Sequence, residues 1–99
     1  MGQASMQEKF TRWDPVERLV TEADHMAYLN ASLDDDPGDG SLIRAALGDI
    51  ARAHGMSRVS RAAGLSREGL YRALSAEGNP EFATVMRVMR ALGLQLRAA

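Results

Sequence analysis

Glycines divide the second half of this chain into short segments, and this division constrains the fold more than any other feature. The first segment, residues 41–54, ends at Gly55 and carries apolar side chains at the spacing of one helix face. These side chains are Ile43, Ala46, Leu47, Ile50 and Ala51. A helix of this length cannot bury its stripe alone. The sequence therefore predicts an all-α fold, a small helical bundle.

Two shorter helices are expected around Gly64. Ser57 is a candidate N-cap for a helix that stops at this glycine, and Ser66 is a candidate N-cap for a second helix that contains Leu70. Glycine tolerates the left-handed conformation that reverses a chain in little space. Small Ser60, four residues before Gly64, would let the second helix approach closely.

The C-terminal part is expected to hold one more helix and a short strand. Gly78, Asn79 and Pro80 break the chain, after which an apolar stripe follows at residues 82–89. We expect this stripe to belong to the core rather than to a dimer contact. Residues 94–96 alternate apolar and polar side chains, as in a terminal strand.

The first forty residues are organised differently. Asp14 before Pro15 predicts a single helical turn, and Thr21 predicts a capped start for a helix over residues 22–33. Residues 34–40 contain only aspartate, glycine and proline, which is typical of a linker. Three parts are predicted: an N-terminal arm at 1–33, a linker at 34–40 and a helical domain at 41–99.

The charges follow a similar division. Residues 1–43 carry three bases against nine carboxylates, a net charge of −6, whereas residues 44–99 carry nine arginines against four carboxylates, a net charge of +5. Guanidinium groups suit phosphate and guanine edges, so the second part is a candidate for binding double-stranded DNA. The alternative is that the arginines reflect codon composition alone.

Several other functions are not expected. The chain has no cysteine and only two histidines, His25 and His54, so neither a metal nor another cofactor is predicted. No apolar run approaches the ~20 residues that span a bilayer, and no secretory leader is visible, so we expect a cytoplasmic protein without membrane association. Nucleophile motifs are missing, and the protein is not expected to be an enzyme.

Residues 56–74 have the spacing of a helix-turn-helix unit that reads DNA. The side chains expected to reach base edges or phosphates are Ser66, Arg67, Glu68, Tyr71 and Arg72 on the second helix, with Ser57 and Arg58 at the start of the preceding helix. Two alternatives remain open, a solvated pair between Glu68 and Arg72 and a core position for Tyr71. Solvent exposure is favoured over phosphate contact for Arg61, Arg87 and Arg90.

The runs ALGDIARAHGMS at 46–57 and AGLSREGLYRALS at 63–75, with the Gly-Asn-Pro corner at 78–80, resemble HigA-like addiction-module antidote proteins. These are helix-turn-helix antitoxins of the Cro/C1 repressor type. The resemblance covers about residues 22–96. Ser60 departs from the alanine usual at that position, and its hydroxyl is expected to bond back to the Met56 carbonyl.

The resemblance implies that the chain neutralises a toxin of the HigB/RelE superfamily and represses its own operon. A single module of this kind buries too little surface to be specific alone, so a homodimer is expected on the operator, with the 94–96 segment or the Met86 and Met89 face as the contact. Such toxins are usually basic, and the acidic arm would suit one. Its apolar anchors would be Phe10, Trp13, Val16, Leu19, Tyr28 and Leu33.

Two alternatives to this interpretation remain. The arm could pack on its own domain instead of binding a toxin. The chain could also be a stand-alone regulator, similar to a phage repressor and without a toxin partner.

Overall fold

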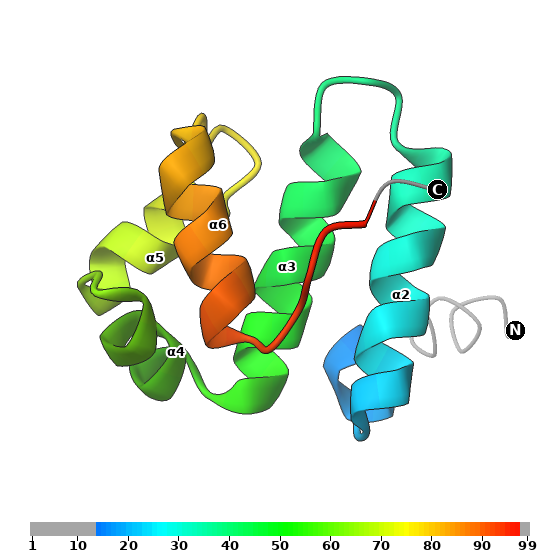
Figure 1. The fold of residues 1–99 in the computed structure, drawn as a ribbon, viewed down its shortest axis with the longest axis horizontal. Helices are drawn as coiled ribbons and strands as arrows, with labels where there is room; N and C mark the ends of the chain where they lie inside the picture. The colour runs from blue at the N-terminus through cyan, green and yellow to red at the C-terminus, as the bar shows by residue number, and fades with distance from the viewer. Residues whose placement is uncertain (1–13, 98–99) are drawn as a thin grey trace, which may run out of the picture.

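The computed structural model describes residues 14–97. These residues form η1 (Pro15–Arg18), a 3-10 helix, and five α-helices: α2 (Glu22–Asp35), α3 (Ser41–His54), α4 (Met56–Ala63), α5 (Arg67–Ala73) and α6 (Phe82–Ala91). Figure 1 shows α3 at the centre, with α2 on one side and α4, α5 and α6 on the other. Within 14–97 no segment forms a strand, so the predicted all-α class is confirmed.

The hydrophobic core is built around α3. This helix has the predicted bounds, and its Ile50 and Ala51 have no exposed surface. Each of the neighbouring helices α4, α5 and α6 contributes at least one large, fully buried side chain: Val59, Leu70 and Val88. Burying one such side chain contributes about 1.5–3 kcal/mol. Helices α3 to α6 therefore share one core rather than forming separate pairs.

The N-terminal helices also pack on this core. The capping box of α2 forms as predicted: the Thr21 hydroxyl accepts from the Asp24 N–H at 3.1 Å, and the Asp24 carboxylate accepts from the Thr21 N–H at 2.9 Å. Leu19 and Leu29 are only 7% and 6% exposed and belong to the core cluster. In residues 14–33, the part of the arm that the structure describes, the chain thus packs on its own domain.

The linker is shorter than predicted, because α2 continues through Asp34 and Asp35. Asp36 then organises the start of α3. Its carboxylate accepts hydrogen bonds from the N–H groups of Gly38, Gly40 and Leu42, at 2.8, 2.9 and 2.9 Å. Desolvation raises the pKa of Asp36, but these N–H donors outweigh it and the net shift is downward. The turn between α2 and α3 is therefore held by the Asp36 carboxylate.

Three details of the second half differ from the sequence predictions. Helix α4 begins at Met56, directly after Gly55, so Ser57 lies inside the helix and is not its N-cap. Residues 94–96 form no strand, since no other strand among residues 14–97 offers a ladder of hydrogen bonds. On α6 the buried face holds Val88 and Met89, while Phe82 is 70% exposed. Burial of Met89 removes it from the candidate dimer contacts.

Gly93 directs the chain after α6. Its φ of +75° lies in the left-handed region, where glycine pays no steric cost. The segment that follows crosses toward α2, as Figure 1 shows.

No helix in the described part of the chain is both long and apolar enough to cross a membrane.

Candidate nucleic-acid interface

The turn between α4 and α5 is a tight glycine corner. Gly64 has a φ of +72°, and the Leu65 N–H donates to the Ser60 carbonyl at 2.8 Å. Together with the bond from the Gly64 N–H to the Arg61 carbonyl, this is a Schellman ending of α4. The Ser60 hydroxyl bonds back to the Ser57 carbonyl at 3.0 Å, not to that of Met56 as expected. The predicted role of Gly64 is confirmed.

Helix α5 starts from a side-chain cap. The Ser66 hydroxyl accepts from the Gly69 N–H at 2.8 Å, which confirms Ser66 as the N-cap. A Cβ at residue 69 would lie only 2.9 Å from the Ser66 Oγ, so glycine leaves room for the cap. Leu70 is completely buried and anchors the helix to the core. The first turn of α5 is thus fixed while its outer face stays open.

All seven residues predicted to contact DNA are exposed. They are Ser57, Arg58, Ser66, Arg67, Glu68, Tyr71 and Arg72. Tyr71 is 48% exposed, so the alternative of a core position for this ring is wrong. The Arg67 guanidinium carbon lies 5.9 Å from the centre of the Tyr71 ring, near the outer limit of a cation–π contact. These two side chains share one surface of α5.

The structure separates Arg58 from the α5 surface. Tyr71 lines a hollow of about 300 Å³. The same hollow is lined by Arg52 of α3 and by Met56, the first residue of α4. Arg58 borders another hollow of about 250 Å³, with Glu22 and His54 among its lining residues. The predicted contacts on α5 therefore cluster, whereas Arg58 faces the junction of α4 with α2 and α6.

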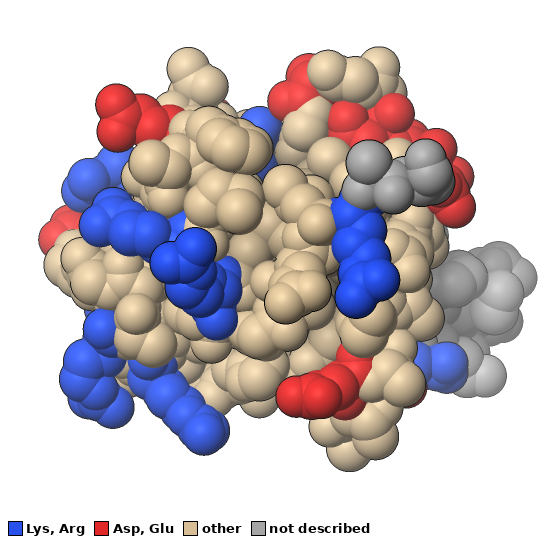
Figure 2. All heavy atoms as spheres, viewed as in Figure 1, with Lys and Arg blue, Asp and Glu red and all other residues tan. Residues whose placement is uncertain are grey.

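The basic residues gather over α4, α5 and α6. Figure 2 shows this cluster on the left, while most of the acidic residues lie on the right over α2 and the linker. The exposed arginines of these three helices are Arg58, Arg61, Arg67, Arg72, Arg87 and Arg90. Arg44 of α3 does not belong to this basic cluster. Its guanidinium donates a hydrogen bond to the Ala76 carbonyl at 3.1 Å. Charge is thus divided between the two sides of α3.

Arg87 is closer to the turn than its sequence position suggests. Its Nη1 atom lies 3.9 Å from the place where a Cβ on Gly64 would be. Arg87 and Arg90 of α6 also border a hollow beside Ala62 and Ala63 of α4. The sequence interpretation favoured plain solvent exposure for both arginines, since nothing in a linear pattern shows that α6 crosses α4 here.

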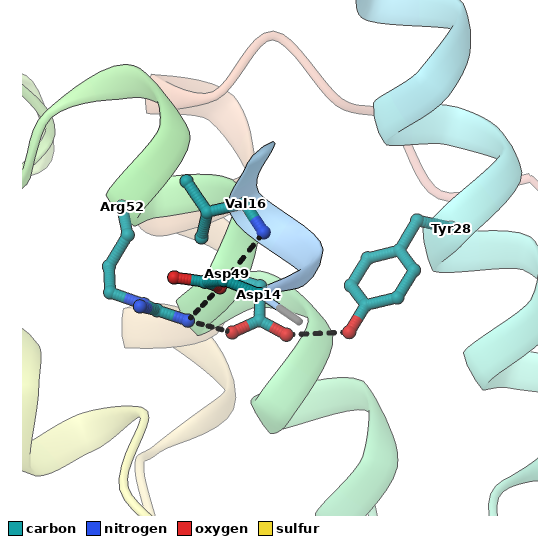
Figure 3. Close-up of polar contacts among 5 residues, drawn as sticks. All are labelled: Asp14, Val16, Tyr28, Asp49 and Arg52. Carbon is teal, nitrogen blue, oxygen red and sulfur yellow. Dashed lines mark hydrogen bonds and ion pairs between the residues drawn. The ribbon is translucent and has the colours of Figure 1, made fainter. Parts of the chain in front are cut away.

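The arm is fastened by a polar network that Figure 3 shows. The Tyr28 hydroxyl donates to the Asp49 carboxylate at 2.5 Å. Arg52 pairs with Asp49 at 2.6 Å and with Asp14 at 3.5 Å. Burial, then the hydrogen bond to Asp49 and its charge, raise the pKa of Tyr28 to about 12. Side chains of α2, of α3 and of Asp14, the N-cap of η1, are joined in this way.

The predicted toxin anchors do not form one surface. Leu19 is buried in the core and is not a surface anchor, because its side chain fills the space between η1 and the rest of the fold. Val16 and Tyr28 are half-buried, and Leu33 is 42% exposed. Phe10 and Trp13 lie outside the described residues. Among the described anchors, Leu33 is the most accessible.

Two histidines, His25 of α2 and His54 of α3, also contact each other. The His25 and His54 rings have centroids 4.9 Å apart, and the His25 Nε2 lies 3.0 Å from the Leu19 carbonyl oxygen. The His54 Nε2 is buried without a hydrogen-bond partner. Desolvation, followed by the charges of His25 and Arg58, lowers the pKa of His54. Within residues 14–97, no three His, Cys, Asp or Glu side chains gather to hold a metal ion.

Comparison with known proteins shows which family the chain belongs to. The features above define a small all-helical protein with a basic helical face opposite an acidic one. A family model described as "Probable addiction module antidote protein" matches residues 9–99, and the chain belongs to this family. It is also similar to an uncharacterized protein of Haemophilus influenzae, with 53% identity over 92 residues that cover 93% of each chain. No solved structure matches.

Proposed function

We propose that the chain is the antidote of a type II toxin–antitoxin pair, a cytoplasmic protein that acts by binding and not by catalysis. It neutralises a HigB/RelE-like toxin and represses its own operon as a homodimer on operator DNA. Its fold is the helix-turn-helix bundle of Cro/C1-type repressors. Family membership supports the antidote role.

The DNA-binding part of this proposal is supported by the geometry of the α4–α5 unit. Leu70 and the Ser66 cap hold α5 in place, while Arg67, Glu68 and Tyr71 are exposed on it. The major groove of DNA admits an α-helix, and a rigid helix with polar, accessible first turns can contact base edges there. In this assignment Arg67 reads a guanine edge, Glu68 accepts from a cytosine amine and Tyr71 reaches phosphate or a thymine methyl.

The phosphate contacts come from the surrounding arginines. Arg72 continues the outer face of α5, and Arg87 lies beside Gly64. Backbone phosphates are bound mainly by electrostatic attraction, so binding weakens steeply with added salt. Ser57 and Arg58 at the start of α4 are the remaining predicted phosphate contacts.

The test is co-expression with the product of the neighbouring reading frame. Under this proposal, cells that express the neighbour alone stop growing, and the chain restores growth and co-purifies with the neighbour. The purified pair then shifts a fragment of its own promoter in a gel. If the neighbour is harmless and does not co-purify while the chain alone shifts the promoter, the alternative of a stand-alone regulator holds.

A further inference from the structure

An apolar groove is lined by residues of α2 and of the C-terminal segment. Figure 1 shows α2 on the side of α3 away from α5, with the C-terminal segment crossing toward it. It has a volume of about 480 Å³, and its apolar lining consists of Met26, Leu29, Leu33, Leu94 and Leu96. Met26, Leu33 and Leu96 are 57%, 42% and 50% exposed. Single exposed apolar residues are ordinary on a protein surface, whereas three around one hollow form a candidate binding surface.

The surroundings of this groove are acidic on the α2 side. Residues 14–43 carry eight carboxylates, and Arg18 is the one base in that stretch. Asp34 and Asp35 directly follow Leu33 at the end of α2 and are exposed. Figure 2 shows acidic side chains at both ends of this part of the molecule. Arg97 lines the groove from the C-terminal segment.

We propose that this groove is where the toxin docks, through a basic surface that inserts an apolar side chain between α2 and the C-terminal segment. This inference rests on the proposed function and names the surface that performs it. The apolar lining supplies the desolvated centre of the interface, and the carboxylates of α2 meet the partner's cations at the rim. Affinity would come mainly from the centre and association rate mainly from the rim.

A second copy of the chain, for which residues 94–96 are a predicted contact, is a poorer occupant of this groove. A two-fold contact brings the same patch of both protomers together, so the acidic ends of two α2 helices would face each other. Like charges at an interface disfavour association. A basic partner is attracted by the carboxylates of α2, and the like charge it meets in the groove is Arg97, so the acidic excess favours a different protein.

The groove and the α5 surface lie on opposite sides of α3. A protein in the groove would leave α5 open, so toxin and DNA can be bound at the same time. The arm contributes to capture through the outer face of α2, whereas its inner face holds α2 to the core.

The test compares two leucines of nearly equal exposure. Leu33 in the groove is 42% exposed, and Leu42 on α3, which does not line the groove, is 40% exposed. Full-length Leu33→Arg and Leu42→Arg are titrated against the toxin from the neighbouring reading frame by biolayer interferometry. We expect Leu33→Arg to weaken binding about tenfold or more, as loss of a central contact does, and Leu42→Arg to leave it within about twofold. Leu33→Gln, which adds no charge, should weaken binding in the same direction.

The possible outcomes separate the two proposals. If the wild-type chain fails to bind the toxin, the proposed function itself fails. If the wild type binds and both Leu33 variants, with wild-type melting temperatures, bind equally well, only the groove is wrong. Equal weakening by Leu33→Arg and Leu42→Arg also overturns the groove. If Leu33→Arg turns a dimer into a monomer by light scattering while toxin binding persists, the groove belongs to a second copy of the chain.

Discussion

The Tyr28 hydroxyl donates a hydrogen bond to the Asp49 carboxylate, and this contact fastens α2 to α3 across 21 positions of sequence. Asp49 also holds Arg52, which in turn reaches Asp14 at the start of η1. The Asp49 carboxylate thus joins α2 to α3, and Arg52 extends the network to Asp14, the N-cap of η1. The arm and the central helix are held together by this network as well as by Leu19 and Leu29 in the core.

Replacing Tyr28 by phenylalanine removes this bond without removing the ring. Hydrogen bonds to charged groups contribute about 1.5–3 kcal/mol, and the half-exposed site lowers this, so we expect Tyr28→Phe to reduce the free energy of unfolding by about 1 kcal/mol. Urea denaturation followed by circular dichroism measures the difference. An unchanged midpoint would show that the bond contributes nothing to stability.

The same tyrosine makes the fold sensitive to alkaline pH. Its pKa is raised from 10.0 to about 12 in the folded protein, so the unfolded chain loses the phenol proton first. Stability should therefore fall as pH rises from about 10 toward 12. Tyr28→Phe should show a smaller decrease over this range. Equal decreases in both proteins would assign the effect to other groups.

Acid should destabilise the protein through His54. Burial and the neighbouring positive charges of His25 and Arg58 lower the pKa of His54 below 6.5, although Glu22 acts in the opposite direction. The unfolded chain then binds a proton more readily, so the free energy of unfolding decreases as pH falls below 6.5. We expect the loss between pH 7.5 and 5.5 to be smaller in His54→Leu. A larger loss in that variant would contradict the assignment.

Gly78 and Gly48 should respond in opposite directions to alanine. A Cβ at Gly78 would lie 2.6 Å and 2.7 Å from the carbonyl oxygens of Arg72 and Ala73, whereas a Cβ at Gly48 meets Leu74 at an ordinary 3.8 Å. Gly78→Ala should cost about 1–3 kcal/mol through overpacking. Gly48→Ala should gain about 0.5–1 kcal/mol from helix propensity. Thermal unfolding of both variants measures the contrast, and shifts of the same sign would refute it.

Arg67→Ala tests direct reading of bases by α5. Loss of a bidentate guanine contact should weaken operator binding by about 1–3 kcal/mol and leave binding to random DNA nearly unchanged. Arg97→Ala is the matched control, because it removes the same charge from the side away from α5. Fluorescence anisotropy on both DNAs measures the effect. Equal losses on operator and random DNA would make Arg67 a phosphate contact.

Local signals in the sequence predict most of this fold. The caps at Thr21 and Ser66, the glycine corner at Gly64 and the bounds of α3 all depend on residues within a few positions of each other. Short-range chemistry of this kind is visible in a linear pattern. The same signals predict that the outer face of α5 is exposed.

Contacts between distant segments could not be predicted in the same way. Leu19 has the pattern of a surface anchor, yet it is buried, because η1 folds back onto α3. Phe82 has the pattern of a core residue, yet it is exposed, because the core contacts the later turns of α6. The 94–96 segment lacks the partner that a strand requires. In each case tertiary packing decides between faces that the sequence leaves equivalent.

The central claim is that one molecule holds a toxin and operator DNA on separate faces. Native mass spectrometry of the co-purified pair, mixed with its own promoter fragment, tests this claim most directly. The account predicts a species that contains the chain, the toxin and the DNA together, and predicts that Arg67→Ala lowers the share of DNA-bound species while the toxin is retained. A spectrum in which DNA displaces the toxin, or in which the chain binds neither, would contradict it.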